Sequence, residues 1–527
     1  MISNKTILLL TDQIWAFPMC LLGEELNKNN NVHYYFTNPE YIQGKNPTKT
    51  HIDFYLSDKV KKENIHDLKD INEKFFENKN NITLDQNRLN ELEQNYTNFS
   101  TINKQLLSSQ LTSSHFHDRF YYELMTNEER LYWLILNYDK TESLIELIKP
   151  DFIFDIETAE LQKSIINEIA YKKKITSINI EYTRYKNFIV PTFSLGLKLD
   201  NYFLETYQKN KEQKDKDHKK YINEIITYRN QNSIVIERNK KYVFSSYQFN
   251  LIKLLKKVIR KSYNFSVSTF RSGNLPTLQT IKKVLWHYTV YFRKFYLYSK
   301  FNKYFKPPTN EQYIYMPLHY IPESTTFTKA PMYINELMII EAISKTMPIN
   351  WKLYVKEHPM MVGERKISFY SKVAKIPNVK LLDFKNHREP KDLIQKSKAV
   401  ITITGSSAFE ASILNKPAIV FGSVFYNVIP GIKVANSFED LEHLFKLIKT
   451  NNWSQDNTMD CATYLRTIDE VGVNLDIEII IKLSAKKIKL QSLDDSEKLK
   501  LKNMINSLIL FYEKAINISK NEQYKKE

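Results

Sequence analysis

The chain has 527 residues, 42% of them hydrophobic, which is enough for two or three domains with buried cores. Its two cysteines, Cys20 and Cys461, are far apart, and their spacing excludes a disulfide framework and a cysteine metal site. The apolar run near the amino terminus is too short for a signal peptide, and no stretch of about 18 apolar residues occurs elsewhere. We therefore expect a cytoplasmic protein without a membrane-spanning segment.

The formal net charge of +17 comes almost entirely from one segment. Residues 238–310 contain 16 Lys or Arg and no Asp or Glu, together with 17 Phe, Tyr or Trp. This mixture suits an anionic membrane surface such as the inner face of the cytoplasmic membrane, an anionic polysaccharide, or RNA. No RNA-binding signature accompanies the charge, so we expect no nucleic-acid partner. The simpler interpretation is a basic helical linker whose aromatic residues are core.

The first 200 residues have the pattern of an α/β domain. Its parallel pattern closes near Pro191, and residues 57–110 are polar and helical where periodic, which indicates a helical insertion. The predicted strands and helices alternate along the chain: strand 5–10, helix 14–26, strand 32–36, helix 127–148, strand 152–156, helix to 171, strand 175–180.

The rest of the chain contains a second α/β half, at 311–450. Residues 201–310 form a charged linker followed by the basic aromatic segment, and residues 451–527 are helical by spacing. Two α/β halves with a helical connector and a helical carboxyl-terminal tail predict two facing Rossmann-type domains with a cleft between them.

One block of the second half joins strand, turn and helix signals to reactive residue types. A strand at 351–355 ends at His358-Pro359, where the proline ends regular pairing and leaves the histidine at the carboxyl end of a strand. A strand at 399–403 leads into a turn with helix N-cap residue types: Thr404, Gly405, Ser406 and Ser407. Such a turn offers backbone N–H groups and a positive helix end to an anion such as phosphate.

Four segments of this half resemble capsule polysaccharide biosynthesis proteins, which are glycosyltransferases of the GT-B fold related to the bacterial Kdo transferases. They are 315–325, 354–359, 404–411 and 416–422. Residues 9–18 also resemble the opening strand and turn of that family. One departure is Ile321, which stands where we expect a polar residue before Pro322-Glu323. The resemblance implies a GT-B fold and transfer from a nucleotide-activated sugar, CMP-linked as in CMP-Kdo.

The resemblance also implies roles for individual residues. His358 is expected to donate a hydrogen bond to the donor phosphate, with Lys356 as a nearby charge. The turn from Thr404 to Ser407 is expected to hold the same phosphate, and Glu410 the ribose hydroxyls of the donor. His319 and Glu323 are expected at the cleft. Each also has an ordinary interpretation, as a packed histidine, a helix cap or an exposed helix residue.

The general base for the acceptor is harder to locate, because it must lie within hydrogen-bond reach of an acceptor hydroxyl. Asp12 and Asp155 are candidates, since each follows a predicted strand of the first half. The one Asp-x-Asp sequence, 215–217, lies in the charged linker, and no His/Cys cluster occurs. We therefore predict chemistry without a metal or a cofactor.

These observations predict a glycosyltransferase that builds surface polysaccharide by transferring a sugar to a glycan or lipid-linked acceptor. A glycerophosphotransferase of teichoic-acid type is an alternative, because it resembles the same fold and uses a His-Pro pair with CDP-linked donors. A non-catalytic polysaccharide-handling protein at the membrane surface is a third interpretation.

Overall fold

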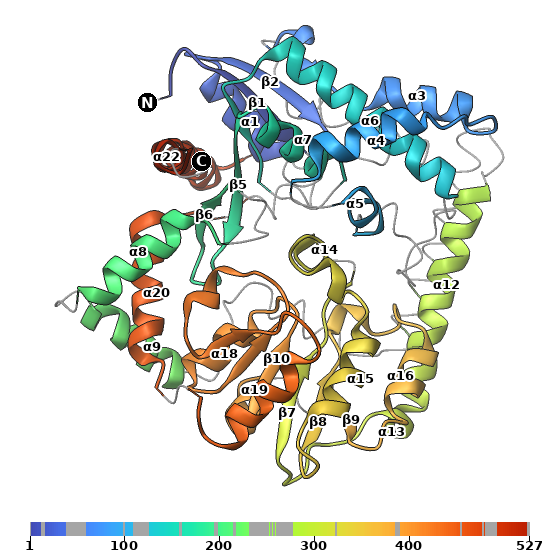
Figure 1. Cartoon of the computed structure of the whole chain (residues 1–527), viewed down its shortest axis with the longest axis vertical. Helices are drawn as coiled ribbons and strands as arrows, with labels where there is room; N and C mark the ends of the chain where they lie inside the picture. Colours follow the sequence, from blue (N-terminus) through green and yellow to red (C-terminus); the bar gives the residue numbers. More distant parts are fainter. Residues whose placement is uncertain are drawn as a thin grey trace.

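The computed structural model shows two α/β domains, which lie one above the other in Figure 1. No described helix is both long enough and apolar enough to cross a membrane. The structure describes residues 2–11, 16–37, 60–98, 101–108, 126–156, 161–193, 199–213, 218–230, 278–321, 324–384, 390–453, 456–476 and 493–523, and the single positions 252, 256, 259 and 479.

The first domain is built on a sheet of seven strands in the order β13-β6-β5-β4-β1-β2-β3. The strands from β5 to β3 are parallel, and the order reverses between β1 and β4. The bounds are β1 Thr6–Thr11, β2 Asn31–Phe36, β3 Ile65–His66, β4 Phe152–Phe154, β5 Thr176–Tyr182, β6 Phe188–Thr192 and β13 Val473–Asn474.

Both faces of this sheet are covered, which explains why β1 is a continuous apolar run. Ile7 and Leu9 face one core, while Leu8 and Leu10 face another. Helices α1 and α22 pack on the first face, and α6 and α7 on the second, where the insertion adds α3, α4 and α5. The bounds are α1 Ala16–Leu26, α3 Lys69–Asn78, α4 Gln86–Tyr96, α5 Ile102–Ser108, α6 Asn127–Ile148, α7 Leu161–Lys172 and α22 Asp495–Gln523.

The last predicted strand, 175–180, is β5 and pairs parallel with β4, but the chain up to Pro191 also forms β6, which was not predicted and pairs antiparallel with β5. Only five residues connect these two strands, and a parallel connection needs a crossover of a dozen or more. Arg184 and Lys186 have positive φ angles of 65° and 47°, which closes the tight turn.

The second domain contains a six-stranded parallel sheet in the order β12-β11-β10-β7-β8-β9. Its order reverses between β7 and β10. The strands are β7 Tyr313–Pro317, β8 Lys352–Lys356, β9 Val379–Leu381, β10 Ala399–Thr402, β11 Ala418–Val420 and β12 Ile432–Val434. The helices are α12 Leu278–Ser299, α13 Phe301–Tyr304, α14 Ser324–Lys329, α15 Glu336–Thr346, α16 Ile367–Val373, α17 Pro390–Lys396, α18 Ser407–Ile413 and α19 Asp440–Lys449.

The two domains are joined by three helices on the left of Figure 1: α8 (Asn201–Glu212), α9 (His218–Asn230) and α20 (Thr458–Val471). Tyr464 of α20 donates from its hydroxyl to the backbone oxygen of Thr183, at 2.7 Å. The rings of Phe203 and Phe425 meet edge to face with centroids 4.7 Å apart. After α20 the chain returns to the first domain, adds β13 to its sheet and ends with α22 against α1.

This architecture confirms the predicted α/β fold with two Rossmann-type domains in a GT-B-like arrangement. The strand β13 is an element that the sequence did not indicate, because two residues are too short to show a period.

A half-buried histidine pair at the edge of the first sheet predicts acid sensitivity. His33 Nδ1 and His66 Nε2 are 3.1 Å apart, and burial, with the neighbouring His33 and Lys140, lowers the pKa of His66 to about 4. Between about pH 6.5 and pH 4 the unfolded chain therefore binds a proton that the folded chain does not, so stability falls as the pH falls through this window.

We expect His66→Gln to reduce this loss, measured as the change in urea midpoint between pH 7 and pH 4.5. His443→Gln, at an exposed position on α19, is the matched control and is expected to behave as the parent protein does. An identical pH dependence in all three proteins would contradict this role for His66.

Candidate functional site

The candidate site lies where the strand order of the second sheet reverses, at the carboxyl ends of β7 and β10. In open α/β sheets this is the position at which ligands bind. His319 follows β7, and its Nε2 accepts a hydrogen bond from the backbone N–H of Thr404, which follows β10, at 3.3 Å. The Nε2 atom is also 3.1 Å from Thr402 Oγ1. The histidine therefore connects the two strand ends from inside the protein.

The turn after β10 needs glycine at position 405. A Cβ atom there would lie 2.5 Å from Thr402 Oγ1 and 3.3 Å from His319 Nε2. The Gly405 N–H donates to Thr402 Oγ1 at 3.1 Å, and the Tyr426 hydroxyl donates to the backbone oxygens of Thr404 and Gly405. The N–H groups of Thr404 and Gly405 are thus used within the protein, and only those of Ser406 and Ser407 are left to serve a ligand.

Two serine hydroxyls follow in this turn, and they differ in their hydrogen bonding. Ser406 Oγ donates to Glu410 Oε1 at 3.2 Å, one helical turn further on. Ser407 is 8% exposed, yet its Oγ has no hydrogen-bond partner. A buried hydroxyl without a partner costs stability, and the position of this one at the reversal point of the sheet makes it a candidate donor to a ligand.

His358 lies at the carboxyl end of β8, next to β7 in the sheet, as predicted. Its Nδ1 accepts the N–H of Met360 at 3.3 Å, and its backbone N–H donates to Glu357 Oε1 at 2.7 Å. A neutral ring that accepts at Nδ1 carries its proton on Nε2 and can donate from that atom. Strand β7 lies between β8 and β10, so the ends of these two strands are two strand spacings, or about 10 Å, apart. A ligand that contains a phosphate can span this distance.

A buried ionic cluster lies behind these loops, centred on Arg365. Its Nε is 3.0 Å from Glu357 Oε2, and its Nη2 contacts Glu336 and donates to the backbone oxygen of His319 at 3.0 Å. Glu336 accepts the backbone N–H of His319 at 2.6 Å, and Tyr370 donates to Glu357 at 2.7 Å. One cation therefore holds two carboxylates, and these hold the loops of His319 and His358.

The cluster shifts the ionisation of its members in opposite directions. Burial raises the pKa of Glu357, although Arg365 and Tyr370 oppose the shift. Burial also acts on Glu336, but Arg365 and His319 outweigh it and hold the pKa of that carboxyl below its usual value. The pKa of Arg365 is raised, because the two carboxylates outweigh its burial. Removal of Arg365 would leave both carboxylates without their cation.

The structure places the other predicted site residues as follows. Lys356 is buried at the end of β8, and Glu410 is buried in α18 beside Ser406. Asp155 is fully buried and pairs with Lys163 at 2.8 Å, so this carboxylate has a structural partner. Asp12, Glu323 and the 215–217 sequence lie outside the described residues. Among the residues that are described, no group of three or more His, Cys, Asp or Glu could hold a metal ion.

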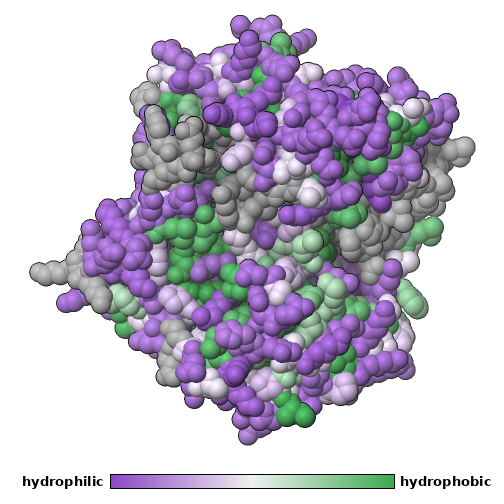
Figure 2. Space-filling model, viewed as in Figure 1, coloured by the Kyte–Doolittle hydropathy of each residue, from purple (hydrophilic) through white to green (hydrophobic). Residues whose placement is uncertain are grey.

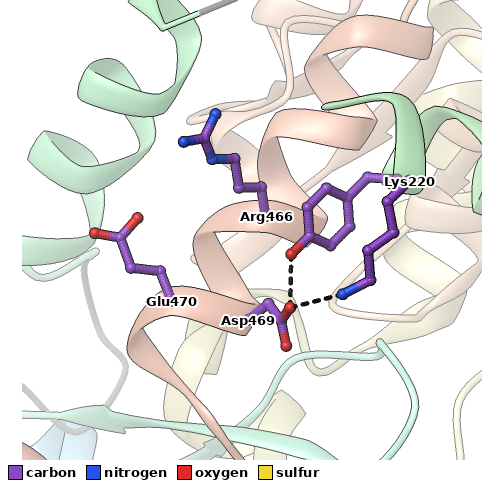
Figure 3. A pocket seen from close by; sticks show the side chains of 5 residues that line it. Lys220, Arg466, Asp469 and Glu470 are labelled. Carbon is purple, nitrogen blue, oxygen red and sulfur yellow. Dashed lines mark hydrogen bonds and ion pairs between the residues drawn. The ribbon is translucent and has the colours of Figure 1, made fainter. Parts of the chain in front are cut away.

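A pocket of about 260 Å³ lies elsewhere, between α9 and α20 (Figure 3). In it, Tyr221 and Lys220 both donate to Asp469 Oδ2, at 2.6 and 3.2 Å, while Arg466 and Glu470 complete the lining. The lining is mostly charged and the volume is below that of usual ligand sites. We interpret it as an ion-pair cluster that joins the two helices, and we place the functional site at the strand ends instead.

The sequence of the second domain is similar to that of a known family. Residues 298–455 match the family described as capsule polysaccharide biosynthesis protein. Over these residues the second domain is similar to this family. The match confirms the resemblance seen in the motifs, and it covers every strand end of the candidate site. Comparison with curated proteins finds no match.

Solved structures with similar folds include transferases and epimerases. KpsC from Thermosulfurimonas dismutans, a beta Kdo 2,7 transferase, is 12% identical, with a TM-score of 0.29 over 66% of this chain and 90% of that chain. A UDP-GlcNAc 2-epimerase from Neisseria meningitidis, bound to UDP-GlcNAc, is 12% identical, with a TM-score of 0.27 over 88% of this chain and 98% of that chain. At these scores the likenesses assign no function, and the fold assignment rests on the strand order.

Sequence reasoning missed Arg365, Glu336 and Tyr426. The sequence Glu357-His358-Pro359 did contain a signal, because a glutamate at the end of a buried strand needs a buried cation. That cation, Arg365, comes eight residues later in a loop without any motif.

The buried cluster gives a stability prediction. We expect Arg365→Met to destabilise the protein by about 3–5 kcal/mol, because it leaves Glu336 and Glu357 buried without their cation. Lys173→Met, which breaks a surface pair with Glu146, is the control and should cost at most about 1 kcal/mol. Urea unfolding followed by circular dichroism measures both. Equal, small effects would show that Arg365 does not hold the cluster.

Proposed function

We propose that the protein is a glycosyltransferase of surface polysaccharide synthesis. It transfers a sugar from a nucleotide-activated donor, CMP-linked, to a glycan or lipid-linked acceptor at the inner face of the cytoplasmic membrane. The observation that carries the proposal is the unpartnered, buried Ser407 hydroxyl at the reversal point of the second sheet, on the same sheet edge as His358. The similarity of this domain to the capsule polysaccharide biosynthesis family supports it.

The geometry accounts for how such a site would assist sugar transfer. When the bond between sugar and phosphate breaks, negative charge develops on the leaving phosphate. Ser407 Oγ, the N–H groups of Ser406 and Ser407, and Nε2 of His358 are donors that can meet this charge. They are held in place beforehand by His319, Gly405 and Glu357, so little reorganisation is needed during the reaction.

His319 has a positioning role in this proposal. Because its Nε2 accepts from Thr404, the proton of the neutral ring lies on Nδ1, which is 3.4 Å from Glu336 Oε1. Both ring nitrogens are therefore engaged within the protein. Glu410 stays the candidate for the donor ribose and Asp12 the candidate for the acceptor base, whereas Asp155 is fully buried and paired with Lys163.

The serines provide a matched test of the phosphate site. We expect Ser407→Ala to weaken binding of the nucleotide product about 10- to 100-fold, because a hydrogen bond to a charged group contributes about 1.5–3 kcal/mol. Ser412→Ala is the control, since this buried hydroxyl of the same helix contacts Cys461 instead. Isothermal titration calorimetry measures both, and an unchanged affinity in Ser407→Ala would overturn the assignment.

His358→Ala separates transfer from folding. We expect it to lower the transfer rate by at least about 100-fold, the usual loss when a donor to developing charge is removed. The melting temperature should change little, because the ring is only half-buried. A stable variant with full activity would remove His358 from the site.

The nucleotide of the donor can be determined by comparing how strongly different nucleotide derivatives protect the protein. In a thermal-shift panel of CMP-, CDP- and UDP-linked compounds, we expect a CMP-sugar to protect the protein most. Stronger protection by CDP-glycerol would favour a glycerophosphotransferase of teichoic-acid type. Protection by none of them would favour a non-catalytic, polysaccharide-handling protein.

A further inference from the structure

Helix α12 has buried and exposed side chains among its described residues. Val290 and Leu297 are buried against the second domain, and Arg293 Nη1 donates to the backbone oxygen of Glu364 at 3.0 Å. Gly363 lets the two backbones approach, since a Cβ there would lie 2.9 Å from the backbone oxygen of Val290. The helix is therefore a fixed part of the second domain.

The opposite face of α12 exposes large apolar side chains. Leu285 is 57% exposed and Phe292 is 70% exposed, and seven residues are two helical turns, so both lie on one face. Phe295, 43% exposed, extends this face. Figure 1 shows α12 along the right-hand edge of the molecule, and Figure 2 shows hydrophobic side chains that project there.

Other described positions of the same basic segment share this character. Ile252 and Ile259, also seven residues apart, are 65% and 66% exposed. Single exposed apolar residues are ordinary on protein surfaces, but a series of them within one segment marks an interaction surface.

The segment of the sequence that contains this face carries formal charge of one sign. Residues 238–310 contain 16 Lys or Arg and no Asp or Glu. The described part of the same segment includes four exposed lysines: Lys256, Lys300, Lys303 and Lys306. The complementary partner is therefore an anionic surface that also accepts apolar side chains.

These features distinguish a lipid surface from other partners. A second copy of the chain would bring two positive surfaces together, which is unfavourable. RNA would match the charge and could stack on Phe292, but Leu285, Ile252 and Ile259 have no ring on which a base can stack. Exposed aliphatic and aromatic side chains in a lysine-rich segment fit the boundary between anionic headgroups and acyl chains.

We propose that the outer face of α12 docks the protein on an anionic membrane, with the helix lying in the plane of the interface and Leu285 and Phe292 inserted at the headgroup boundary. Because the inner face of α12 is fixed to the second domain, docking also sets the orientation of that domain on the membrane. This inference does not depend on the proposed catalytic function.

Vesicle co-sedimentation of the full chain tests it. We expect binding to vesicles of phosphatidylglycerol and phosphatidylcholine, and weak binding to phosphatidylcholine alone. The double variant Leu285→Ser/Phe292→Ser should lower the partition coefficient by about tenfold or more, because each side chain loses its apolar burial. Ile349→Ser, at a fully exposed isoleucine before β8, is the matched control and should bind as the parent does.

Three results would overturn the inference. The first is no binding to anionic vesicles, and the second is equal binding by the double variant and the parent. The third is a concentration-dependent oligomer, seen by analytical ultracentrifugation, that the double variant loses without any change in vesicle binding. The melting temperature of the double variant, with and without a CMP-sugar, serves as the folding control and separates this test from that of the donor site.

Discussion

The candidate site depends on one buried cation. Arg365 lies among two carboxylates, Glu336 and Glu357, that are almost completely inaccessible to solvent, and neither could stay ionised there without a partner. Through Glu336 it fixes the loop of His319, which in turn holds the turn at Thr404. Through Glu357 it fixes the backbone of the neighbouring His358 loop. The positions of both predicted phosphate-binding elements thus follow from a single ionic cluster, although Arg365 itself belongs to neither element.

The second constraint is the connection between the domains. One hydrophobic core runs through both, and it includes the rings of Phe203, Phe425 and Tyr464. An ion pair between Lys329 of α14 and Glu181 of β5 adds a direct contact near the strand ends. Because the chain returns after α20 to add β13 and α22 to the first domain, each domain is built from sequence on both sides of the other. Such an arrangement couples the stability of the first domain to the folding of the second.

Much of the second domain could be predicted from local signals. The elements of the block from 399 to 422 could be predicted because strand, turn and helix follow one another within about two dozen residues. A glycine or proline follows each element: Gly405, Pro417 and Gly422. The contacts of His319 could not be predicted from the sequence. It was expected at the cleft, and both of its ring nitrogens bind groups within the protein. Glu357 indicated that a buried cation was needed, but no motif marks Arg365, Glu336 or Tyr426 themselves, because their partners are set by tertiary contacts. The antiparallel β6 was missed for a similar reason, since strand direction depends on the length of the connection and leaves no period in the sequence.

The central claim is that the turn after β10 and the loop after β8 bind the phosphate of a nucleotide. The most direct test is a crystal structure of the protein with the nucleotide product CMP. The account predicts the phosphate within hydrogen-bond distance of Ser407 Oγ, with the ring of His358 facing it. A nucleotide bound elsewhere, for example between α9 and α20, with the Ser407 hydroxyl still unpartnered, would contradict the account.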